Sequence, residues 1–269
     1  MGLFNNYAKP GKGVEKDEKR PIGLIMYFTL LGRKFGSYVK LNFMYALTCI
    51  PSIFVMFFLV SSFLFDLSMF TTEDLPIVMS FSGAFAIAIS MIFGLSPFSS
   101  GYYYILRNFA REEHSWMSDF WEIFRKNMKY SILSWIIDTV IIAIAIVSLR
   151  VYGILLLTNN SLYAIPIIIM LLAFVVFALS NPYKWTIMVT FESSLKDIYK
   201  NSMFFVMGNF WRSLMQFIFS AVYITALVIF SFLFSIIAYI VIAVIGFSLF
   251  GLIQAVTLYP VIAKYTNQE

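Results

Sequence analysis

A long stretch of the sequence, from Leu214 to Ala263, contains no Asp, Glu, Lys or Arg. As one α-helix it would extend about 75 Å, at about 1.5 Å per residue. The hydrocarbon core of a bilayer is only about 30 Å thick, so one straight span cannot accommodate the stretch. It therefore predicts two membrane helices joined by a turn somewhere between Phe234 and Gly246.

The composition places the rest of the chain in the same class. Hydrophobic residues make up 61% and charged residues 12%, whereas soluble domains carry about 25% charged residues. Four further apolar runs are long enough to cross a bilayer, at about 42–65, 77–95, 130–149 and 162–185. The second is expected to extend beyond Pro97. We predict an all-α polytopic membrane protein with about six transmembrane helices arranged as three hairpins.

The distribution of positive charge predicts how these helices are oriented. Only Arg150, among 19 Lys and Arg residues, falls in a loop on the side opposite the N-terminus. By the positive-inside rule both termini are cytoplasmic. The net charge of +5 is thus a topology signal, and we expect no nucleic-acid partner. Residues 1–34 are interpreted as a cytoplasmic tail and interfacial segment, and residues 35–269 as a single transmembrane domain.

Each helix that returns to the cytoplasm carries a proline near its inner end, at Pro97, Pro182 and Pro260. Proline lacks a backbone donor and kinks a helix, so we predict three kinks near the membrane surface. The alternative is three unrelated helix ends that share interface chemistry.

An amphipathic segment precedes the third predicted span, at Asp119–Lys129. Its polar residues recur at helical spacing on one face, and its apolar residues form the opposite face. Such a helix lies flat in the membrane interface. Residues 192–200 repeat this pattern ahead of the fifth span. We therefore expect interfacial amphipathic helices to lead into the hairpins.

No motif for catalysis or metal binding is present. The sequence lacks a phosphate-binding loop, a nucleophile elbow and a zinc-protease helix. A single histidine and a single cysteine, Cys49, argue against a histidine-rich metal site and an intrachain disulfide. We expect no cofactor, no metal and no enzymatic activity.

Asp138 is the only acidic residue well inside a predicted span. Ionisable groups at membrane depth are costly and raise a functional hypothesis. Two roles stay open. Asp138 can be a neutral structural group that hydrogen-bonds Gln216 or Gln254, or it can carry a proton or bind a substrate.

A dense charged cluster follows the second predicted span. It comprises Arg107, Arg111, Glu112, Glu113 and His114. One interpretation is a solvated loop with local ion pairs. The other is a docking surface for a cytoplasmic or membrane partner.

Several motifs resemble the YesL family of bacterial integral membrane proteins, a family of unknown function. They are MGLFNNY at 1–7, GRKF at 32–35, KLNF at 40–43, IP at 50–51, and LRNFAREEH at 106–114 followed by DF at 119–120. The likeness is most specific across residues 97–130. It implies a multi-pass protein of the bacterial cytoplasmic membrane. It also implies association with carbohydrate uptake, because genes of this family commonly lie beside sugar ABC importers.

Two functions are therefore expected. The first is a non-enzymatic accessory protein that docks on the permease subunits of a carbohydrate ABC importer. The alternative is a small-solute transporter or channel in its own right, with Asp138 and the helices near Pro97 and Pro182 lining the path.

Overall fold

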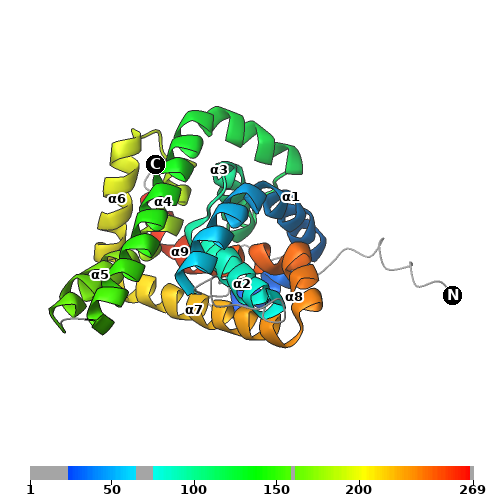
Figure 1. The fold of residues 1–269 in the computed structure, drawn as a ribbon. Helices are drawn as coiled ribbons and strands as arrows, with labels where there is room; N and C mark the ends of the chain where they lie inside the picture. Colours follow the sequence, from blue (N-terminus) through cyan, green and yellow to red (C-terminus); the bar gives the residue numbers. More distant parts are fainter. Residues whose placement is uncertain (1–23, 65–74, 159–160, 267–269) are drawn as a thin grey trace.

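The structure is a computed structural model that describes residues 24–64, 75–158 and 161–266. Every regular element in these ranges is helical (Figure 1). The helices are α1 (Leu24–Leu64), α2 (Leu75–Phe93), α3 (Ser99–Ala110), α4 (Met117–Thr158), α5 (Ala164–Met188), α6 (Leu195–Gly208), α7 (Phe210–Leu233), α8 (Ser235–Val241) and α9 (Phe247–Thr266). A 3₁₀ turn (Ser161–Tyr163) precedes α5, and a π-helical turn (Ile242–Gly246) joins α8 to α9.

Five segments are long and apolar enough to cross a membrane. They are Ile25–Phe63, Met117–Leu157, Ser161–Met188, Phe210–Leu233 and Ile236–Lys264. The sixth predicted span corresponds to the shorter apolar helix Val78–Phe93 in α2. Large apolar side chains face outward along these helices, and Ile144, Leu172 and Val222 are each 62% exposed. Water-soluble monomers rarely expose such surfaces, so the prediction of an all-α polytopic membrane protein is confirmed.

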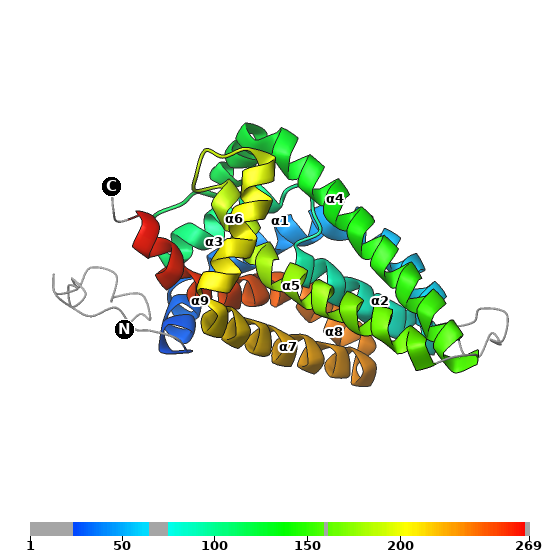
Figure 2. The ribbon, with the colours of Figure 1, turned by 90° about the vertical axis from the view of Figure 1, so that its left-hand side faces the viewer.

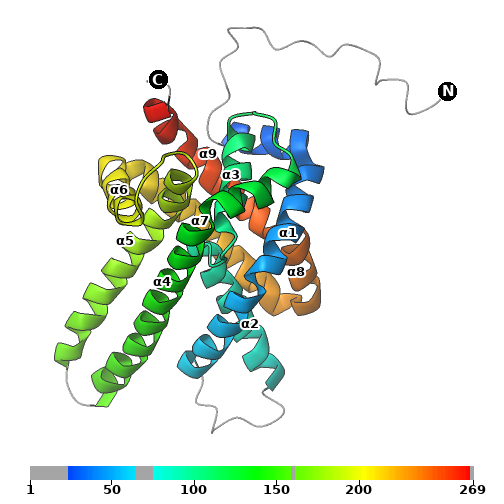
Figure 3. The same cartoon turned by 90° about the horizontal axis from the view of Figure 1, so that it is seen from above.

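The long helices form three hairpins, which pair α1 with α2, α4 with α5, and α7 with α8 and α9. The end of α1, the start of α2, the end of α4 and the start of α5 lie at one end of the bundle (Figure 3). The start of α1, the end of α9, α3 and α6 lie at the other end, which we call the basic end because it carries most of the described Lys and Arg residues. The predicted cytoplasmic tail falls mostly on residues 1–23, which lie outside the described residues.

The first helix begins earlier than the predicted span. α1 runs from Leu24 to Leu64, with non-helical backbone angles at Lys34. Met26 and Leu30, which precede this kink, are buried in the main core. The segment before Lys34 is therefore packed against the bundle at the basic end.

Pro97 does not kink a continuous helix. The predictions of a kink there and of a second span that extends beyond Pro97 are therefore wrong. α2 ends at Phe93, and Gly94 then adopts a left-handed conformation with φ +54°. A Cβ atom on Gly94 would lie 2.9 Å from Trp185 Nε1, so both the backbone angle and the space require glycine. Pro97 lies just ahead of α3, where its missing N–H interrupts no helical hydrogen bond. Pro182 and Pro260, by contrast, lie inside α5 and α9, so the three prolines do not share one setting.

The amphipathic segment before the third span is not a separate helix. It is continuous with the span in the 42-residue α4. Figures 1 and 3 show that α4 bends, so that its first turns run across the basic end. The second amphipathic segment forms the separate helix α6, which crosses α5 and α7 (Figure 2). Ser194 caps α6 by accepting a hydrogen bond from Asp197 N at 3.3 Å.

The uncharged stretch turns at Phe234, which has φ −137° and ψ 53°, within the predicted interval. The π-helical turn that follows is held by the buried side chain of Asn42. Its Nδ2 donates to Ile242 O at 3.1 Å and to Ala243 O at 2.7 Å, and its Oδ1 accepts from Ser248 N at 2.9 Å. A π turn shifts the backbone pairing by one residue, and Asn42 satisfies the groups that this shift leaves free.

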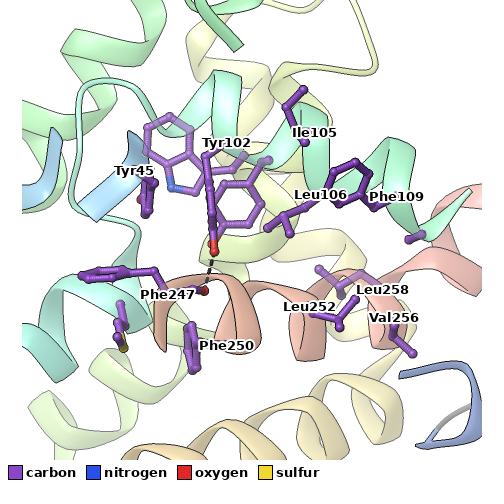
Figure 4. Close-up of a cluster of buried hydrophobic side chains, with 14 of the residues drawn as sticks. Tyr45, Tyr102, Ile105, Leu106, Phe109, Phe247, Phe250, Leu252, Val256 and Leu258 are labelled. Atoms are coloured by element: carbon purple, nitrogen blue, oxygen red, sulfur yellow. Dashed lines mark hydrogen bonds between the residues drawn. The ribbon is translucent and has the colours of Figure 1, made fainter. Parts of the chain in front are cut away.

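The main core lies where α1, α3 and α9 meet (Figure 4). Tyr45 stacks on Tyr102, with ring centroids 3.8 Å apart. The Tyr102 hydroxyl donates to Phe247 O at 2.5 Å. This close approach of α3 to α9 positions the polar residues of α3 beside the long helices.

Candidate functional site

A buried ion pair joins α4 to α5. Lys184 Nζ donates to Asp138 Oδ2, and the side chains are 2% and 0% exposed. The Tyr199 hydroxyl, from α6, donates to Asp138 Oδ1 at 2.7 Å. Both carboxylate oxygens thus have a donor, as a charge in a low-dielectric interior requires. We call the buried pair Asp138 and Lys184, together with the half-buried Tyr199, the buried triad.

Aromatic rings enclose the ammonium group of Lys184. Its Nζ lies 4.4 Å from the ring centroid of Trp185 and 5.2 Å from that of Tyr199. Such positions let the ring quadrupoles stabilise the cation. Burial, followed by the Asp138 carboxylate, raises the pKa of Tyr199, so its hydroxyl remains a donor at neutral pH.

The expected partners of Asp138 are therefore wrong. Gln216 and Gln254 were predicted to hydrogen-bond a neutral Asp138, but Lys184 and Tyr199 occupy its two oxygens. The charge distribution counts Lys184 with the cytoplasmic cations, at the inner end of the predicted span 162–185, and does not pair it with Asp138. The sequence does indicate that Lys184 lies within a span, because the largely apolar run continues past it through residues 185–188.

Gln216 and Gln254 come together elsewhere in the bundle. Both line a cavity of about 180 Å³ between α2, α5, α7 and α9. Gln254 Oε1 accepts from the Tyr103 hydroxyl at 2.7 Å. The Tyr103 ring stacks on Trp185 with centroids 6.2 Å apart, so two aromatic rings link Gln254 to the buried triad.

Arg107, from the charged cluster, makes contacts within the chain. Its Nη1 donates to Val189 O at 2.8 Å and to Thr190 Oγ1 at 3.1 Å, at the end of α5. Its Nε and Nη2 donate to Asn108 Oδ1 at 3.2 and 3.1 Å. Burial and then the nearby Arg111 lower the pKa of Arg107, although arginine stays protonated in proteins. Arg107 therefore ties α3 to α5.

The acidic members of the cluster contact α1. Glu112 pairs with Arg33 at 2.8 Å, and Lys34 Nζ donates to Glu113 O at 3.1 Å. Arg111 lies 3.7 Å from Glu113. We call these five residues the α1–α3 junction. His114 is exposed, and its ring lies 4.7 Å from that of Trp116. Local ion pairs are thus present, and the docking role of the exposed residues stays a prediction.

A polar pocket of about 490 Å³ opens beside this cluster at the basic end. α4 contributes Lys126, Asn127 and Tyr130, and the α5–α6 connection contributes residues 189–194. Lys126 and Glu192 are both exposed there, so the pocket presents both signs of charge. Among the described residues, no three His, Cys, Asp or Glu side chains gather where they could hold a metal ion.

The long apolar helices define the chain as an all-α polytopic membrane protein. Residues 83–149 match the profile of the family described as "Protein of unknown function, DUF624". This match covers part of α2, all of α3 and most of α4, and it confirms the resemblance to a YesL-like family of unknown function. No curated protein and no solved structure matches the chain.

Proposed function

We propose that the protein is a non-enzymatic accessory subunit in a bacterial cytoplasmic membrane, where it binds the permease subunits of a carbohydrate ABC importer. The polar pocket at the basic end supports this proposal most directly. Its volume of about 490 Å³ is large enough for a short segment of another protein, and the exposed Lys126 and Glu192 in its lining offer opposite charges. Charges of both signs favour orientation and specificity over raw affinity. The family resemblance supports the importer as partner.

The buried triad also favours an accessory role over transport. Asp138 and Lys184 neutralise each other, and Tyr199 satisfies the remaining carboxylate oxygen. A proton or substrate carrier needs a group that exchanges partners, whereas these groups are fully engaged with one another.

Lys126→Glu tests the docking surface, and Lys129→Glu is its matched control. Both lysines are exposed on α4 and lie one turn apart, but only Lys126 lines the pocket. In pull-downs from native membranes, we expect Lys126→Glu to lose the importer subunits and Lys129→Glu to retain them. Equal recovery with both variants would refute docking at the pocket.

A transporter or channel is the second candidate, because an ion pair within membrane-spanning helices is a common feature of transport pathways. The variant that combines Asp138→Leu with Lys184→Met removes both charges together. Under the accessory proposal, co-purification with the importer survives in this variant. Loss of solute uptake into proteoliposomes that contain only this protein, with the fold intact, would favour the transporter.

A further inference from the structure

The cavity between α2, α5, α7 and α9 has the size of a site for a small molecule. Its volume is about 180 Å³, and Ile92, Ala178, Gln216, Ser220, Phe250 and Gln254 contribute to its lining. An apolar cavity of about 150 Å³ is large enough to bind benzene. The space therefore fits one aromatic ring or a short aliphatic chain with one polar group.

A buried amide with unmet hydrogen-bonding capacity lines this space. Gln216 is 3% exposed, and its Oε1 has no hydrogen-bond partner among the described residues. Its Nε2 makes only a long contact of 3.4 Å to Ser220 Oγ. Leaving a buried acceptor unpaired costs free energy, and a bound donor would recover it. If the amide is turned over, its nitrogen takes the place of the unpaired oxygen and needs an acceptor instead.

The cavity reaches the outer surface of α7. Two of its small lining residues, Ala221 and Thr225, are exposed. Next to them lie Val222, which is 62% exposed, and Ile218, which is 51% exposed. These residues belong to a membrane-spanning segment. A molecule that enters here comes from the hydrocarbon phase and must be soluble in lipid.

We propose that this cavity binds a small lipid-soluble alcohol, whose hydroxyl group bonds the Gln216 amide while its apolar part fills the remaining space. A hydroxyl both donates and accepts, so it satisfies either orientation of the amide. The site is independent of the proposed docking pocket, which lies at the basic end of the bundle.

Benzyl alcohol and toluene test the proposal, because they share a ring and differ by the hydroxyl group. A ligand that binds only the folded state raises the melting temperature. We expect benzyl alcohol to raise the melting temperature of the purified wild-type protein in detergent by several degrees more than toluene does. In Gln216→Leu this excess should vanish. Comparing the two proteins cancels the effect of each molecule on the detergent.

Two further variants complete the design. Ala221→Phe adds a ring to the cavity lining and takes up space that the ligand would fill, so it should reduce the response to both molecules. Ser231→Ala, on the same helix but outside the lining, should respond like the wild type. Equal shifts by both molecules in the wild type would overturn the proposal. So would a persistent excess in Gln216→Leu or in Ala221→Phe.

Discussion

At the scale of single residues, the buried triad is the feature most sensitive to substitution. Asp138→Asn preserves size but leaves the Lys184 ammonium buried without a counter-charge. We expect it to lower the free energy of unfolding by about 3–5 kcal/mol, as removal of one member of a buried pair does. Combining Asp138→Leu with Lys184→Met removes both charges, and we expect stability equal to or above that of the wild type.

Chemical denaturation in mild detergent, followed by tryptophan fluorescence, compares these variants. If Asp138→Asn is as stable as the wild type, Lys184 does not depend on this carboxylate. The ion pair would then have no structural role.

Gly94 is a second sensitive residue. Its φ of +54° and the approach of Trp185 both exclude a side chain. We expect Gly94→Ala to destabilise the protein by about 1–3 kcal/mol, the usual cost of a strained backbone position. Gly153→Ala is the control, because Gly153 lies inside α4 near its end and a Cβ atom there meets nothing within 4 Å. A thermal melt that shows equal shifts for the two variants would contradict this account.

The sequence identified one member of the triad and missed the other two. Asp138 stands out because acids are rare inside apolar runs. Lys184 was missed because it lies near a helix end, where lysine normally reaches the membrane surface. Its partner lies 46 residues earlier in the chain, and no local pattern encodes a contact of that separation. Tyr199 comes from α6, whose position across α5 follows from tertiary packing alone.

At the scale of helices, Arg107 determines how α3 meets α5. Arg107→Gln removes the charged donor from Val189 O and Thr190 Oγ1. We expect a loss of about 1.5–3 kcal/mol, typical of hydrogen bonds to charged groups. Arg111→Gln is the matched control, since its ion pair at the surface contributes only about 0–1 kcal/mol. Melting temperatures of the two purified variants make the comparison, and a larger loss in Arg111→Gln would contradict it.

The helices themselves were largely predictable, but their ends were not. Apolar length fixes where membrane spans must lie, so all five long spans and the shorter α2 fall within or around the predicted runs. The break after Phe93 depends on Gly94 and its contact with Trp185, and the sequence near Pro97 does not reveal that contact. Likewise, nothing in the sequence around Asn42, at the start of a predicted span, indicates that its side chain supports a π turn some 200 residues away.

At the scale of the whole molecule, the two ends of the bundle should face opposite sides of the membrane. Ser118 lies near the start of α4, and Ser161 just follows its end. Both are exposed. Cys49 is buried, so we expect the thiol reagent to label only an added cysteine. We expect Ser161→Cys to react with an impermeant thiol reagent in intact cells, and Ser118→Cys to react only after permeabilisation.

The wild-type protein, which has only Cys49, controls for background labelling. The reverse pattern of labelling would overturn the positive-inside assignment. It would also place the docking pocket on the outer side of the membrane, where no cytoplasmic partner could reach it.

The ion pair between α4 and α5 also has a consequence for biosynthesis. A lone charge at the centre of a helix costs about 2.5–3.5 kcal/mol during insertion by the translocon. Asp138 emerges from the ribosome before Lys184, so α4 cannot neutralise its carboxylate until most of α5 has been synthesised. We therefore expect α4 to remain at the translocon until α5 has been synthesised, and to enter the lipid together with it. The pair thus makes the second hairpin, rather than the single helix, the unit of membrane insertion.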